Sequence, residues 1–155
     1  MKKMKQKLEI FGIANKLRRI LKWKLLLIIG ILIFMLFAHI VDDYYLQGWL
    51  ASAKQQKWWE KNAPDKLYKF DYIMALFCHA LSWSIMIFLP ILIYSLINNI
   101  NLNWFYLAIP INLIIHAIVD DLKANKFKIN LIVDQSIHFI QIIITWVIFL
   151  FIYCI

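Results

Sequence analysis

The sequence predicts an all-α polytopic membrane protein, a bundle of four transmembrane helices preceded by a basic amphipathic helix at the membrane interface. Composition is the first observation behind this prediction. Hydrophobic residues make up 63% of the 155 residues and charged residues 17%, against about 45–50% and about 25% in a typical soluble domain. A soluble domain of this size could not hide so much apolar surface, because about 30% of its unfolded area stays exposed after folding. The excess is expected to face lipid.

The apolar residues are gathered into four long runs, which is the second observation. A helix that crosses a hydrocarbon core of about 30 Å needs about 20 residues, so each run predicts one span, the first of them short. The runs are continuously apolar rather than alternating, and they are longer than the 9–11 or so residues of a membrane barrel strand. The predicted spans are residues 25–41, 72–97, 100–119 and 131–155.

Residues 1–24 differ from the predicted transmembrane domain, 25–155, in being strongly basic. Nine of the 17 Lys and Arg residues lie there, and apolar side chains recur at helical spacing between residues 8 and 23. Such a pattern is typical of an amphipathic helix that lies along the headgroups and anchors the first span. A cleaved signal peptide is disfavoured, because Leu36 and Ala38 do not form a small-residue cleavage site.

The net charge of +8 does not indicate a nucleic-acid partner, because the basic residues lie beside the spans and no nucleic-acid-binding motif is present. The expected partner is the lipid bilayer, and the expected location is the cell membrane, crossed several times. Orientation and oligomeric state stay open. Cys78 and Cys154 are predicted toward opposite ends of their spans, about 20 Å or more apart in depth, which is too far for a disulfide bond.

The four histidines all lie within predicted spans, and three of them are one helical turn from an aspartate. The pairs are His39 with Asp43, His116 with Asp120, and His138 with Asp134. Residues four apart share a helix face, and the alternating direction of the spans brings all three pairs and His79 to the same leaflet. Ionisable groups are costly against lipid, so they are expected to face the bundle interior.

Imidazole and carboxylate groups gathered at one level predict a site for a divalent transition metal, since these ligands suit Zn, Mn or Fe and four-helix bundles build metal sites from inward-facing pairs. No organic cofactor is expected. A proton or cation relay, or a purely structural set of hydrogen bonds and ion pairs, would use the same residues. The candidate ligands are His39, Asp43, His79, His116, Asp120, Asp134 and His138.

A bound metal can activate water, so the function that the sequence favours is a metal-dependent hydrolase of a lipid or lipid-linked substrate. The candidate catalytic residues are Asp43, Asp120 and Lys123, the last of which would pair with an anionic substrate group. No nucleophile motif based on Ser, Cys or Thr is recognisable. The alternative is a non-enzymatic membrane protein: a relay, a small channel or a phage-linked factor. The expected supporting polar residues are Gln47, Gln135 and Gln141.

Three motifs carry a family resemblance. Residues 39–47, HIVDDYYLQ, resemble the H-x3-D-[FY]-x-L-Q signature of a family of small bacterial and phage membrane proteins, catalogued as domain of unknown function 3307. The H-x3-D-x2-K motif at residues 116–123 and the D-Q-x2-H motif at residues 134–138 are similar to its later signatures, and His79 matches a histidine usual in its second span. The resemblance covers about residues 32–150. It implies a four-helix membrane fold and supplies no activity.

The chain departs from the family pattern in its long basic N-terminal segment and in two acidic doublets, where one Asp is typical. The doublets are Asp42–Asp43 and Asp120–Asp121. Spacing selects Asp43 and Asp120 as the site residues, because each follows a histidine by four positions. We expect Asp42 and Asp121 to be solvated charges at the membrane edge.

Overall fold

The computed structural model describes the backbone of residues 2–153 and the side chains of residues 11–153. Within that part of the chain, helices are joined by turns without any strand, and four helices are long and apolar enough to cross a membrane. The predicted fold class is confirmed. These four helices are α1 (Lys2–Ile40), α4 (Asp71–Ile97), α5 (Phe105–Ala124) and α6 (Leu131–Tyr153).

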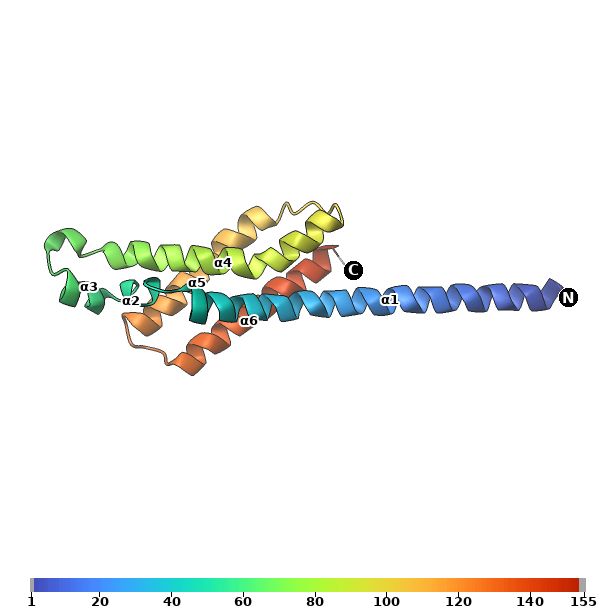
Figure 1. Cartoon of the computed structure of the whole chain (residues 1–155), viewed down its shortest axis with the longest axis horizontal. Coiled ribbons are helices and arrows are strands. Elements are labelled where there is room, and N and C mark those ends of the chain that lie inside the picture. The colour runs from blue at the N-terminus through green and yellow to red at the C-terminus, as the bar shows by residue number, and fades with distance from the viewer. Residues whose placement is uncertain (1, 154–155) are drawn as a thin grey trace.

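Helix α1 is continuous over 39 residues, and Figure 1 shows it running straight past the bundle toward the N-terminus. The helix has no break between residues 24 and 25, so the basic segment continues the first span without a turn, and the division into an interfacial segment and a transmembrane domain stays a prediction. The physical reason is local: residues 16–29 are mainly Leu, Ile, Lys and Arg with no Pro, so helix propensity is not interrupted. The position of this extension at the headgroups stays a prediction.

The other spans differ from their predicted bounds at their ends. Helix α5 begins at Phe105 rather than residue 100, because Asn99 has a left-handed φ of 53° and the chain turns before the helix starts. The same helix runs on to Ala124, so the whole second motif is helical. Helix α6 ends at Tyr153 in the described part of the chain. The predicted end of this span and the expectation for Cys154 lie outside the described residues.

The four long helices pack around an apolar core that fills one half of the bundle. Helix α4 contacts both α1 and α5, and α6 contacts α5 and α1. The core side chains include Met35, Ile87, Ile142 and Phe149, all fully buried, and Trp83 lies at the boundary between this core and the polar half. In a helix bundle that lies in lipid, whose tails are as apolar as these side chains, packing is stabilised by dispersion contacts rather than by removal from water.

The segment between α1 and α4 folds back over the polar end of the bundle. Helix α1 continues into a π-helical turn, η1 (Val41–Leu46), a geometry that is frequent at functional sites. Gly48, with a φ of 48°, then lets the chain turn into the short helices α2 (Leu50–Ala53) and α3 (Gln56–Asn62) and the 3-10 turn η2 (Lys66–Tyr68). Contacts between α2 and α4 bring this loop onto the bundle.

Candidate metal site at one end of the bundle

The four histidines lie together where α1 ends and α4 begins, and each is at most 1% exposed. The rings of His116 and His138 are stacked with centroids 4.1 Å apart, and the ring of His79 is 5.0 Å from that of His116. His39 lies 5.9 Å from His138. The structure therefore brings together the side chains that span direction and helical spacing predicted to converge.

His79 Nε2 is surrounded by potential metal donors from two other elements, α5 and η1. It lies 3.1 Å from His116 Nε2, 3.2 Å from Asp120 Oδ2 and 3.4 Å from Asp43 Oδ1. His116 Nε2 lies 3.8 Å from the same Asp120 oxygen and 4.0 Å from the same Asp43 oxygen. Asp43, His79 and His116 form a group whose donor atoms all lie within 4.8 Å of one another, close enough to hold one ion.

A second group shares His116 and extends onto α6. It consists of His116, Asp120 and His138, again with donor atoms within 4.8 Å of one another. His138 Nε2 is 3.5 Å from Asp120 Oδ1 and 3.5 Å from Asp134 Oδ1. Asp120 therefore faces His79 with one carboxylate oxygen and His138 with the other, which places it between the two groups.

His39 is held differently from the other three histidines. Its Nδ1 accepts a hydrogen bond from Trp83 Nε1 at 2.7 Å, which places the ring proton on Nε2, where it is donated to Gln135 Oε1 at 3.0 Å. Gln135 in turn donates to Asp43 Oδ2 and Asp134 Oδ2, each at 3.1 Å. Both nitrogens of His39 are engaged, so these contacts favour a positioning role over the ligand role predicted for it.

Two lysines neutralise part of the carboxylate charge. Lys54, only 6% exposed, donates to Asp120 Oδ2 at 2.5 Å, and Lys123 forms an ion pair with Asp134 Oδ2 at the edge of the cluster. Sequence reasoning missed Lys54, because it is one of five lysines in a polar loop and no motif marks it. Only the packing of α2 against α4 brings it to the site.

The two acidic doublets behave differently. Asp42, expected to be a solvated charge, is instead 1% exposed and accepts a hydrogen bond from Ser82 Oγ at 2.6 Å. It is buried because α4 packs against η1 on the side that Asp42 faces. Asp121 matches its expectation: it is partly exposed and pairs with Lys126 at 2.7 Å, and this hydrogen bond raises the pKa of Lys126.

The remaining supporting glutamines lie at the margin of the cluster or below it. Gln47 Nε2 donates to the backbone oxygen of Asp43 at 2.5 Å and so stabilises its own turn. Gln141, one turn along α6 from His138, donates to the backbone and side-chain oxygens of Asn112, each at 2.8 Å. Gln141 therefore links α6 to α5 beneath the cluster, while Gln135 is the glutamine that contacts the candidate ligands.

A pocket of about 390 Å³ opens beside the cluster, between the end of α1 and α6. Its lining is mostly aromatic and apolar, and Gln135 forms its polar wall. Since Gln135 contacts both Asp43 and Asp134, this pocket is separated from the cluster by one side chain. The other lining residues are Ile40, Tyr44, Tyr45 and Phe139.

The fold and the site together define a class: an all-helical protein with four helices long and apolar enough to cross a membrane, built around buried His and Asp groups that could hold a metal ion. The chain belongs to the family described as protein of unknown function DUF3307, whose profile matches residues 31–153. This match spans all three motifs and His79. No curated protein and no solved structure matches the chain.

Proposed function

We propose that the cluster binds a divalent transition metal (Zn, Mn or Fe) and that the protein is a membrane-embedded, metal-dependent hydrolase of a lipid or lipid-linked substrate. The donor geometry around His79 carries the proposal. A tetrahedral ion with ligands at about 2.0–2.2 Å holds its donors about 3.3–3.6 Å apart. The distances that join His79 and His116 to each other and to Asp43 and Asp120 run from 3.1 to 4.0 Å. These four residues are the proposed ligands.

The charge at the cluster supports a bound cation. Among the described side chains, the cations in contact with its carboxylates are Lys54 and Lys123. With neutral imidazoles, the cluster then holds two more negative charges than positive ones, and uncompensated buried charge costs several kcal/mol. One divalent ion would balance it. The four carboxylates are those of Asp42, Asp43, Asp120 and Asp134.

Unpartnered polar atoms also support the proposal. Within the described residues, Asp43 Oδ1, Asp134 Oδ1 and His138 Nε2 are buried without a hydrogen-bond partner. Such an atom costs about 1–3 kcal/mol. Asp43 Oδ1 belongs to the proposed ligand set, so coordination would satisfy it. Asp134 Oδ1 and His138 Nε2 face each other at 3.5 Å, a separation longer than that of a direct hydrogen bond.

The chemistry follows from these positions. A divalent ion held by these four residues would need a fifth coordination position for water, and there it would supply an activated water and polarise the bond to be hydrolysed. His138 lies next to Asp120 outside the proposed tetrahedral set, so its Nε2 is placed to accept the proton of the attacking water. Asp134 would stabilise the imidazolium that forms, because its Oδ1 faces the same nitrogen from 3.5 Å. Lys123, 28% exposed beside Asp134, would bind an anionic group of the substrate.

The pocket beside Gln135 supports a lipid as the substrate. Its aromatic lining includes Tyr44 and Tyr45, which are 56% and 77% exposed. At the end of a transmembrane helix, exposed tyrosines are typical of the level of the headgroups. An apolar chain in this pocket would leave its headgroup close to the cluster, so we infer that the substrate enters sideways from one leaflet.

Metal analysis of the detergent-purified chain tests the binding half of the proposal. After supplementation with Zn or Mn and removal of loosely bound ions, we expect about one metal per chain. His79→Ala is expected to abolish stoichiometric binding, because His79 Nε2 contacts all three other proposed donors. His39→Ala is the matched control and is expected to retain metal. Wild-type protein with well under one metal per chain, or full metal in His79→Ala, would contradict the proposal.

Lipid hydrolysis by the metal-loaded protein tests the catalytic half. The probes are vesicles that contain phosphatidylglycerol or a polyprenyl diphosphate, with products followed by mass spectrometry. We expect hydrolysis that a chelator stops, and a loss of about 10²–10⁴-fold in rate in His138→Gln, which removes the proposed proton acceptor. His138→Gln should keep its metal. A metal-loaded protein that hydrolyses neither lipid would leave the ion structural rather than catalytic.

A further inference from the structure

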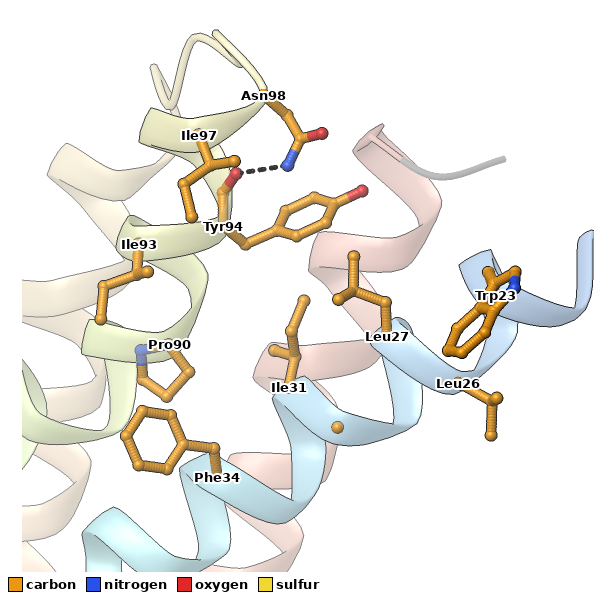
Figure 2. A pocket seen from close by; sticks show the side chains of 11 residues that line it. Trp23, Leu26, Leu27, Ile31, Phe34, Pro90, Ile93, Tyr94, Ile97 and Asn98 are labelled. Atoms are coloured by element: carbon orange, nitrogen blue, oxygen red, sulfur yellow. Dashed lines mark hydrogen bonds between the residues drawn. The ribbon is translucent and has the colours of Figure 1, made fainter. Parts of the chain in front are cut away.

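An apolar groove of about 450 Å³ lies between α1 and the C-terminal half of α4, at the opposite end of the bundle from the His and Asp cluster. Figure 2 shows the facing side chains, which include Ile31 and Phe34 from α1 and Pro90 and Ile93 from α4. Gly30 leaves the space open, because nothing lies within 4 Å of the position that a Cβ would take. The groove is a hollow in a surface that is expected to contact lipid tails.

The length of the groove matches one leaflet. From Trp23 to Phe34 the α1 wall spans twelve residues, or about 16 Å from the first to the last at 1.5 Å per residue, and half of a hydrocarbon core is about 15 Å. The two ends also differ in polarity. Trp23 and Asn98 line one end, while Phe34 lines the other. A tryptophan at this position is typical of the level of the headgroups.

The face of α1 that lines the groove continues into basic residues. Arg19 lies four positions before Trp23 and Lys16 three positions before Arg19, a helical spacing that keeps them on the same face. Both side chains are exposed. No Asp or Glu occurs between residues 10 and 41. Arg19 is about 6 Å beyond Trp23 along the helix axis, where the phosphate of a lipid whose chain fills the groove would lie.

We propose that this groove binds an anionic glycerophospholipid, with one acyl chain along the α1–α4 wall and its phosphate beside Arg19 and Lys16. Charge complementarity favours a lipid over a second copy of this chain. In a two-fold symmetric dimer the same faces would meet, which would bring these cations against their own counterparts. The site is independent of the proposed metal site, which lies at the other end of the bundle.

Native mass spectrometry of the full chain tests whether Arg19 and Lys16 select a lipid with an anionic headgroup. The protein is released from vesicles of equimolar phosphatidylglycerol and phosphatidylcholine with identical chains. Wild-type protein is expected to retain phosphatidylglycerol preferentially, and the double variant Lys16→Gln/Arg19→Gln is expected to lose at least about fivefold of that preference. Lys61→Gln/Lys66→Gln removes the same charge from two exposed lysines in the loop at the other end of the bundle and is expected to keep it. No preference in the wild type, or equal losses in both double variants, would overturn the proposal.

A substitution that fills the groove tests whether an acyl chain of the lipid lies in it. Gly30→Leu places a side chain in open space and is expected to lower the amount of both lipids retained, without a change in folding. Gly12→Leu is the matched control, because its Cβ would also meet nothing within 4 Å and it lies outside the groove. Unchanged lipid retention in Gly30→Leu would overturn the proposal. So would disulfide-linked dimers formed in the membrane by Gly30→Cys, which would identify a second copy as the occupant.

Discussion

Asp120→Ala is expected to destabilise the protein by about 3–5 kcal/mol, the usual cost of breaking a buried ion pair. Asp120 is 1% exposed and is the carboxylate that Lys54 contacts at 2.5 Å. Its removal leaves that ammonium buried without a partner, and it also removes a donor that lies 3.2 Å from His79 and 3.5 Å from His138. The measurement is the free energy of unfolding in mixed micelles, followed by circular dichroism.

The neighbouring residue provides the control. Asp121→Ala is expected to have little effect on the same unfolding free energy, because its partner Lys126 is exposed and exposed ion pairs contribute little. Replacing both members of the buried pair, in Lys54→Met/Asp120→Leu, is expected to recover part of the loss, because no unpaired charge remains. Equal losses in Asp120→Ala and Asp121→Ala, or no recovery in the double variant, would contradict this account.

Trp83→Ala is expected to lower the free energy of unfolding by about 3–5 kcal/mol, because a cavity replaces a fully buried indole. Trp83 stacks on the ring of His116 with centroids 4.2 Å apart and donates to His39 Nδ1. Its loss therefore removes packing from the apolar core and support from two histidines at once. The same unfolding measurement in mixed micelles checks the prediction.

Two variants separate the contributions of Trp83. Trp83→Phe keeps an aromatic ring and removes the N–H donor. It is expected to lower the free energy of unfolding by about 1–3 kcal/mol, because His39 Nδ1 is left buried without its hydrogen-bond partner. Trp23→Ala, at a tryptophan that is 69% exposed, should leave the unfolding free energy nearly unchanged. If Trp83→Phe were as destabilising as Trp83→Ala, the hydrogen bond rather than the packing would account for the effect.

The candidate site was predictable to the extent that it rests on local spacing. His116 with Asp120, and Asp134 with His138, are four residues apart on single helices, and a helix places such residues on one face wherever it packs. The same rule paired His39 with Asp43, and His39 Nδ1 lies 3.6 Å from Asp43 Oδ2. The prediction that the pairs converge also used the direction of the spans. Consecutive membrane helices run in opposite directions, so the end of one span lies on the same side as the start of the next.

The roles within the cluster were not predictable, because they depend on contacts between residues far apart in the chain. His39 is engaged by Trp83 and Gln135, 44 and 96 residues away, so a pattern that treats all four histidines alike cannot single it out. Lys54 reaches Asp120 across 66 residues. Asp42 is buried by α4 packing against η1, which no spacing within its own helix reveals.

The sequence by itself determined the all-helical class, the four helices that are long and apolar enough to cross a membrane, and the convergence of the His and Asp pairs. Composition and helical periodicity, on which these predictions rest, are properties of short segments. The tertiary structure decided that α1 continues straight from its basic end into the bundle and that a groove forms between α1 and α4. It also decided that Lys54, in the loop after η1, contacts Asp120. Each of these depends on which helix faces meet. That choice is made by packing between side chains that the linear order of residues does not bring together.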